Sequence, residues 1–325
     1  MTTLIEAEAL RKTFGHIVAV DDISLTVEKG EVLGFLGPNG AGKSTTMKMI
    51  TGFLEPDSGT SRIAGIDIGA DPIGAKRQIG YLPEGAPAYA DMTPRSFLGF
   101  IAEIRGYNGG AAKARADAAA EKAGLLSVWN QRIETLSKGY KRRVGIAQAI
   151  LHDPAVLIMD EPTDGLDPNQ QHQVRELIKQ MAKDKAIIVS THILQEVEAV
   201  CTRAVIIDKG RIVADGTAED LQKRMPYHQA VALRVSAASA DKAKAALEKL
   251  PGIARVEIMS KAGDGKPAGA VALRAFPQAD RQIATAVATL MREQGIDVEE
   301  LYVEKGRLDD VFRQITSSEG ARRNA

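Results

Sequence analysis

Residues 37–45 have the clearest chemical meaning in this sequence. They read Gly-Pro-Asn-Gly-Ala-Gly-Lys-Ser-Thr, after an apolar run at 32–36 and before a helix-compatible run at 45–51. Glycines at this spacing let several backbone N–H groups turn onto phosphate oxygens, and a following helix adds its positive end. The pattern predicts a polyphosphate-binding loop between a strand and a helix. The alternative, a glycine turn with an incidental lysine, leaves this setting unexplained.

Each position of the loop has an expected role. Lys43 is expected to bind the outer phosphates, and the Ser44 hydroxyl is expected to reach Mg²⁺. Three glycines are expected to adopt backbone conformations that other residues avoid: Gly37, Gly40 and Gly42. The predicted nucleotide-binding positions of the loop are Gly37, Pro38, Asn39, Gly40, Ala41, Gly42, Lys43, Ser44 and Thr45.

Two adjacent carboxylates follow a second apolar segment. Residues 155–159 form a continuous apolar run, typical of a strand buried on both faces of a parallel sheet, and Asp160 and Glu161 come next. Desolvating two carboxylates is costly unless they have a function. Asp160 is expected to hold Mg²⁺, and Glu161 to orient or deprotonate the attacking water, which contributes about 10²- to 10⁴-fold in rate. A cap on the following turn would explain one carboxylate but not both.

Between these motifs, residues 136–143 read Leu-Ser-Lys-Gly-Tyr-Lys-Arg-Arg. This segment resembles the signature motif of ABC-transporter ATPases, and roughly the first 220 residues resemble that family with its motifs in the same order. The resemblance implies an α/β P-loop NTPase of ABC type, with a RecA-like parallel sheet, an antiparallel β edge and a helical subdomain at about 85–150. It also implies ATP hydrolysis, with ATP and Mg²⁺ as cofactors.

The resemblance assigns roles to three further positions. Phe14 stands where the family has an aromatic residue that stacks on adenine, although the sequence alone favours an ordinary core aromatic equally. Glu84 occupies the Q-loop position, and His192, after the expected strand 186–189, matches the switch histidine that steadies the γ-phosphate. The implied ligands of Mg²⁺ are Ser44, Glu84 and Asp160, and the implied catalytic residues are Glu161 and His192.

Two motifs complete the resemblance. The signature residues expected to act on the ATP of another protomer are Ser137, Lys138, Gly139 and Tyr140, and the D-loop residues are Asp164 and Asp167. Lys138 and Tyr140 replace the usual Gly and Gln, and could add cationic or donor groups at the phosphate. Glu84 replaces the usual Gln; it keeps an oxygen for Mg²⁺ but loses an N–H donor. These variants resemble ATPases of ABC-2-type exporters, including the gliding-motility-associated subgroup.

Composition agrees with a cytosolic protein. The 325 residues contain 42 Lys and Arg and 42 Asp and Glu, so no basic field predicts direct contact with nucleic acid. The single cysteine, Cys201, excludes an intrachain disulfide and suits a reducing compartment. The N-terminus lacks the features of a signal peptide, and no apolar stretch approaches the ~18 residues of a membrane span. Any membrane-spanning part is therefore expected on another polypeptide.

The chain exceeds the usual size of one hydrophobic core, so we expect two domains. The ATP-binding domain is expected at 1–225 and a C-terminal α+β domain at 226–316, with 317–325 a disordered tail. The second domain shows the order βαββαβ around a turn at 263–267, which predicts a ferredoxin-like fold. It carries no nucleotide motif or nucleophile, so a regulatory or docking role is expected.

Together these features predict a cytoplasmic ATPase subunit, peripheral on the cytoplasmic face of the membrane, that powers an exporter by ATP-driven dimer closure. The expected partners are integral membrane permease subunits and a second ATPase subunit. One chain carries both halves of the site, which favours a homodimer, while a heterodimer stays open. The alternative is a soluble ABC-type ATPase acting on a protein or nucleic-acid machine. A single P-loop, no coiled-coil insertion and no basic stripe disfavour it.

Overall fold

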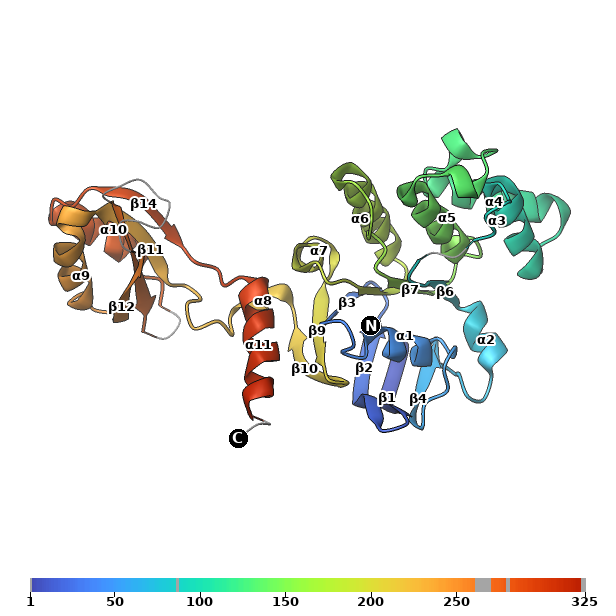
Figure 1. Ribbon diagram of the computed structural model, residues 1–325, viewed down its shortest axis with the longest axis horizontal. Helices are drawn as coiled ribbons and strands as arrows, with labels where there is room; N and C mark the ends of the chain where they lie inside the picture. Colours follow the sequence, from blue (N-terminus) through green and yellow to red (C-terminus); the bar gives the residue numbers. More distant parts are fainter. Residues whose placement is uncertain (1, 86–87, 261–269, 279–280, 323–325) are drawn as a thin grey trace. The chain divides into compact units, whose positions relative to one another are not determined.

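The computed structural model describes residues 2–85, 88–260, 270–278 and 281–322. The chain divides into two compact units, Met1–Ala218 and Glu219–Ala325, which are described separately (Figure 1).

The first unit is built on a six-stranded sheet with the order β10-β9-β3-β8-β7-β6. Its strands are β3 (Val32–Leu36), β6 (Ile79–Leu82), β7 (Val156–Asp160), β8 (Ala186–Ser190), β9 (Arg203–Asp208) and β10 (Arg211–Gly216). All neighbours are parallel except β9 and β10, which form an antiparallel hairpin. Every residue of β3, β7 and β8 is buried. The continuous apolar runs of the sequence therefore form strands covered on both faces, which confirms the predicted parallel sheet.

An antiparallel sheet covers one face of the parallel sheet, together with helix α1 (Lys43–Ile50) (Figure 1). It has the order β2-β1-β4-β5, from β1 (Thr3–Phe14), β2 (Ile17–Glu28), β4 (Ser58–Ile63) and β5 (Ile66–Asp67). Side chains of both sheets and of α1 share one core, including Ile5, Val20, Met47 and Ile158. The loop that joins β3 to α1 is therefore fixed at both ends by buried structure.

Helices cover the opposite face (Figure 1). They are α3 (Pro94–Ile104), α4 (Gly109–Lys122), α5 (Lys138–Ile150) and α6 (Pro168–Ala182), with two 3₁₀ turns at Leu126–Val128 and Ile133–Thr135. Two shorter helices complete the unit, α2 (Pro72–Arg77) and α7 (Leu194–Val200). Helix α3 begins at a capping box between Thr93 and Ser96, with Pro94 at its first helical position. Leu98 and Ile146 share a core with Met159 of β7, which ties α3 and α5 to the strand that ends at Asp160.

The second unit has the predicted ferredoxin-like order. Its elements are β11 (Val231–Ser236), α9 (Ala240–Glu248), β12 (Ile253–Ser260), β13 (Ala270–Pro277), α10 (Ala284–Glu293) and β14 (Val298–Val303), with a 3₁₀ turn at Ala237–Ser239. The sheet order is β12-β13-β11-β14 with antiparallel neighbours, so each helix links two strands that flank a third. The predicted turn at 263–267 lies outside the described residues.

The ends of the second unit differ from expectation. The units divide at 218/219, whereas the sequence suggested 225/226, and all of α8 (Ala218–Gln222) except its first residue lies in the second unit. A Cβ added to Gly306 would lie 2.5 Å from the Gln222 carbonyl oxygen, so these two backbones are in close contact. Helix α11 (Leu308–Arg322) extends through most of the segment where a disordered tail was predicted. The described part of that segment is thus helical, and it contains no proline, which would end a helix.

Candidate nucleotide site

A pocket of about 430 Å³ lies where β3 and β7 end, at the edge of a parallel sheet where ligands usually bind. Its lining residues are Phe14, Ala19, Asn39, Gly40, Ala41, Gly42, Lys43, Ser44, Thr45, Glu84, Asp160 and Glu161. Most of the predicted loop and both carboxylates of the second motif therefore meet in one cavity. Ala19, on β2, is the one lining residue that the sequence did not indicate.

The three loop glycines are required for two different reasons. Gly40 and Gly42 have φ angles of 80° and 107°, in the region that favours glycine. Gly37 does not have a positive φ. A Cβ there would lie 2.3 Å from the Ile207 carbonyl oxygen, so Gly37 is needed for close backbone approach. At Gly42 both reasons apply, because a Cβ would also lie 2.5 Å from the Ala19 carbonyl oxygen.

Lys43 is held inside the loop. Its side chain is buried, and Nζ donates hydrogen bonds to the carbonyl oxygens of Gly37, at 2.6 Å, and Pro38, at 3.1 Å. Burial lowers the pKa of Lys43, while the carboxylates of Glu161 and Asp160 oppose that shift. The loop thus positions a desolvated ammonium group beside two carboxylates, an arrangement that a phosphate and a divalent cation together would neutralise.

Glu161 occupies an unusual backbone position at the end of β7. Its φ is 48°, a left-handed conformation that costs energy in a residue with a side chain. Its N–H donates to Ser190, with Oγ at 3.0 Å and O at 3.2 Å. The Ser190 hydroxyl in turn donates to Oδ1 of buried Asp160. His192 follows Ser190 closely in the chain, and its Nδ1 lies 3.0 Å from Oε1 of Glu161. The predicted catalytic pair is thus in direct contact, although His192 does not line the pocket.

The pocket offers oxygen donors suited to Mg²⁺. Ser44, Glu84 and Asp160 all line it, giving one hydroxyl and two carboxylates. Within the described residues, no cluster of three or more His, Cys, Asp or Glu side chains forms a metal cage. Mg²⁺ commonly takes only one or two carboxylates from the protein, with phosphate oxygens and water completing its shell. The donor set therefore fits Mg²⁺ bound together with a nucleotide.

Phe14 is not a core aromatic. It lies at the end of β1, is 50% exposed and lines the pocket. The neighbouring backbone is fixed by Asp57, which accepts hydrogen bonds from Lys12 Nζ at 2.8 Å and from the Thr13 N–H at 2.7 Å. These bonds lower the pKa of Asp57 to about 2. Sequence reasoning did not find this contact, because Asp57 is distant in the chain from the strand it fixes.

The signature residues lie at the start of α5, outside the pocket. Ser137 is exposed and caps the helix, accepting a hydrogen bond from the Tyr140 N–H at 3.3 Å. Tyr140 Oη is 3.2 Å from the Ser127 hydroxyl, so this side chain contacts the helical subdomain of its own chain. Lys138 is exposed, whereas Gly139 is buried. A Cβ on Gly139 would lie 2.2 Å from the side-chain oxygen of Gln170 on α6.

The D-loop aspartates also lie outside the pocket. Asp164 is exposed, and Asp167 caps α6 by accepting a hydrogen bond from the Gln170 N–H at 2.9 Å. Asp167 therefore has a structural role as a helix cap, in addition to its place in the motif. The sequence carried the signal for it, because an aspartate followed by proline is typical of a helix start.

A buried carboxylate connects the two segments that follow β7 and β8. Glu196, on α7, is 5% exposed and accepts hydrogen bonds from the hydroxyls of Thr163 and Thr191, the latter at 2.7 Å. Thr163 precedes the D-loop, and Thr191 precedes His192. The sequence did not indicate Glu196, because a glutamate in a short surface helix usually faces solvent.

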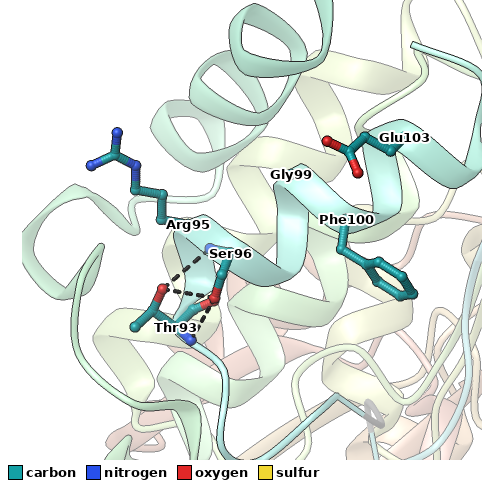
Figure 2. A pocket seen from close by; sticks show the side chains of 6 residues that line it. All are labelled: Thr93, Arg95, Ser96, Gly99, Phe100 and Glu103. Atoms are coloured by element: carbon teal, nitrogen blue, oxygen red, sulfur yellow. Dashed lines mark hydrogen bonds between the residues drawn. The ribbon is translucent and has the colours of Figure 1, made fainter. Parts of the chain in front are cut away.

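A second surface lies on α3 of the helical subdomain. A groove of about 390 Å³ lies along this helix, and Figure 2 shows the residues that line it. A Cβ added to Gly99 would meet no atom within 4 Å, so this position leaves the groove open. Its lining residues are Thr93, Arg95, Ser96, Gly99, Phe100 and Glu103. Phe100 contacts the edge of the Tyr89 ring, with ring centroids 5.8 Å apart, and Tyr89 and Ile104 are 56% and 64% exposed. Clustered exposed apolar side chains of this kind mark interaction surfaces.

Comparisons with known proteins agree with this geometry. Residues 20–164 match the family described as ABC transporter. Linearmycin resistance ATP-binding protein LnrL of Bacillus subtilis (strain 168) is 40% identical over 234 residues, which cover 72% of this chain and 75% of that protein. Nod factor export ATP-binding protein I of Paraburkholderia xenovorans (strain LB400) is 38% identical over 213 residues, 65% of this chain and 70% of that protein. A solved ATP-binding subunit of an ABC transporter superposes with a TM-score of 0.63 at 33% identity, covering 68% of this chain and 92% of that one.

Proposed function

The chain belongs to the ATP-binding proteins of ABC transporters, and from this premise we propose that it is the ATPase subunit of an ABC-2-type exporter and works as a closing homodimer. One observation carries the proposal. The pocket gathers the phosphate loop and both carboxylates, whereas Ser137 stands on an exposed helix end that does not line it. A second copy of the chain would supply that missing side of the site.

The chemistry follows from the contacts of the pocket. Lys43 and the loop N–H groups bind the phosphates of ATP, and Phe14 stacks on the base. Ser44, Glu84 and Asp160 would hold Mg²⁺, which neutralises charge on the phosphates when bound. Glu161 takes the proton of the attacking water, and its contact with His192 keeps the carboxylate aimed at the γ-phosphate. Hydrolysis removes the γ-phosphate that joined the two protomers, and the dimer opens.

Transport requires membrane partners on other chains. Within the described residues, no helix has the length and apolar character to cross a bilayer. We propose that the protein acts at the cytoplasmic face, bound to integral membrane permease subunits through the exposed side chains of Tyr89, Phe100 and Ile104. The export direction is supported by the Nod factor export relative. Phe100→Glu should release the ATPase from membranes that contain its permease, with ATPase activity in solution unchanged.

The dimer is tested with Glu161→Gln, which keeps the shape of the side chain and removes the base. Turnover should fall about 10²- to 10⁴-fold while ATP still binds. ATP should then stabilise the dimer by mass action, so size-exclusion chromatography should show a dimer in ATP and a monomer in ADP. Unchanged turnover would contradict the role of Glu161. A variant that binds ATP but stays monomeric would contradict the homodimer.

A second substitution tests the signature side of the site. Ser137→Asp retains a helix-capping side chain but places a negative charge toward the γ-phosphate of the opposing protomer. Added to Glu161→Gln, it should return the protein to a monomer in ATP. The matched control is Glu176→Gln on the exposed part of α6, which should leave the ATP-bound dimer intact.

A further inference from the structure

Arg142 is a buried cation that the proposed reaction does not yet use. It lies on α5, five residues after Ser137, and is 5% exposed. Within the described part of the chain it forms no ion pair, and its Nε has no hydrogen-bond partner. Burying a guanidinium group without a carboxylate partner costs free energy, so we expect Arg142 to have a function.

Its hydrogen bonds all go to backbone carbonyl oxygens at the nucleotide site. Nη2 donates to the carbonyl oxygens of Glu161 and of Asp160, the latter at 3.0 Å, and Nη1 donates to that of Pro83 at 3.3 Å. Asp160 and Glu161 end β7, and Pro83 precedes Glu84. One planar side chain thus joins the signature helix to two other motifs.

The environment explains why the cation is tolerated. Burial lowers the pKa of Arg142, and nearby carboxylates oppose this shift by favouring the charged form. These carboxylates belong to Asp164, Asp160, Glu161 and Glu84. Arg142 therefore offsets part of the negative charge of these four carboxylates.

Glu161 is the residue that most needs such support. Its left-handed φ of 48° is strained, so the conformation persists only where surrounding contacts hold it. The N–H side of the residue is fixed by Ser190, and the carbonyl side is fixed by Arg142. Removing either contact would let the backbone relax and would change the direction of the carboxylate.

We propose that Arg142 is a positioning residue for the hydrolysis reaction. It holds Glu161 in its strained backbone conformation, so that the orientation of the Glu161 carboxylate depends on the position of α5. The inference rests on the proposed role of Glu161 as the base. Ser137 is the N-cap of the same helix, α5. When the partner protomer contacts this end of α5, the helix transmits the contact as a rigid element to the Glu161 carboxylate. ATP binding does not depend on Arg142, which does not line the pocket.

The decisive substitution is Arg142→Lys, which keeps the charge but replaces the two donor nitrogens Nη1 and Nη2 with one nitrogen on a shorter side chain, which cannot occupy both positions. We expect kcat to fall about 10- to 100-fold, since small misplacements of a catalytic group have effects of this size. The KM for ATP and the Kd measured by calorimetry should stay within about twofold, because the binding contacts are retained. Arg175→Lys, on α6, is the matched control. Its Nε donates to the Gln171 carbonyl oxygen at 3.3 Å, away from the pocket, and its kinetics should match wild type.

A double-mutant cycle separates positioning from general support of the fold. If Arg142 acts through Glu161, adding Arg142→Lys to Glu161→Gln should not lower the residual single-turnover rate further. The ATP-bound dimer of Glu161→Gln should also persist in the double variant. Equal rate losses in both backgrounds, or a lost dimer, would overturn the inference.

The remaining outcomes are also decisive. Wild-type kcat in Arg142→Lys, together with an inactive Glu161→Gln, would overturn this inference and leave the proposed function standing. An active Glu161→Gln would instead overturn the proposed function. If neither Arg142→Lys nor Arg142→Gln folds, as judged by thermal unfolding, Arg142 serves the core as a whole and the positioning role is wrong.

Discussion

His192 and Glu161 contact each other across two neighbouring parallel strands, with Nδ1 of the imidazole 3.0 Å from Oε1 of the carboxylate. The register explains why they meet. Asp160, the last residue of β7, is paired with Ser190, the last residue of β8, so the segments that follow leave the sheet side by side. The contact is therefore set by strand pairing, and Glu196 reinforces it by bonding to both segments.

From this contact we predict that His192→Ala lowers turnover about 10- to 100-fold while ATP binding is retained, because Glu161 loses the partner that orients it. The measurement is steady-state ATPase activity beside calorimetric ATP binding. His172→Ala, at an exposed position on α6, should behave as wild type. Normal turnover in His192→Ala would show that the backbone alone orients Glu161.

The two loop glycines with positive φ should differ in their tolerance of alanine. Gly40 has open space where a Cβ would stand, so Gly40→Ala should cost only the backbone strain, about 1–2 kcal/mol of unfolding free energy. Gly42→Ala adds a clash with the Ala19 carbonyl oxygen and should cost more, with loss of ATP binding. Denaturant unfolding and calorimetry check both. Equal effects would mean that the loop moves freely enough to relieve the clash.

Stability should fall as the pH drops below 6.5, in part because of His152. Burial, with a smaller contribution from Arg105, lowers the pKa of its ring to about 4, and Nε2 lies 3.0 Å from the Ile79 carbonyl oxygen. Between pH 6.5 and 4 the unfolded chain binds the proton and the folded protein does not, so the stabilisation present above pH 6.5 is lost on acidification. His152→Gln should flatten the pH dependence of the unfolding free energy over this range. An unchanged slope would assign the acid sensitivity to other groups.

We predict that the fragment 1–218 folds and binds ATP as the full chain does. The pocket is formed entirely by residues before 218, and so is the core of both sheets of the first unit. The comparison is the fragment 1–225, which adds the apolar residues Leu221 and Met225 without the rest of their unit. It should be no more stable and should aggregate more readily. Higher stability of the longer fragment would support the boundary that the sequence predicted.

The sequence predicted the elements whose signals are local. The strands β3 and β7 were visible as continuous apolar runs, and the loop at 37–45 as a glycine pattern, because each depends on residues next to each other in the chain. The order βαββαβ was readable for the same reason. The alternation of short apolar strands and helices is a property of the segment itself.

Contacts between distant segments were not readable. Arg142 lies in a motif that was recognised, yet it donates to a backbone carbonyl group 19 residues further on. Every residue has such a carbonyl group, so the sequence does not indicate which one Arg142 contacts. Glu196 looked like a surface glutamate until the fold placed two threonine hydroxyls around it. The close approach of Gly37 to Ile207 was also not readable, because it depends on strand pairing rather than on the backbone angles of Gly37.

The half-exposed ring of Phe14 has a consequence for the nucleotide specificity of the site. A flat aromatic face attracts any purine by stacking, and it does not distinguish an amino group from a carbonyl group on the edge of the base. Among the described residues that line the pocket, the polar side chains belong to the phosphate loop and to the carboxylates beyond it, the groups expected to bind the triphosphate and Mg²⁺. Such a site would accept GTP nearly as well as ATP, and the relative abundance of the two nucleotides in the cell would decide which one drives the transporter.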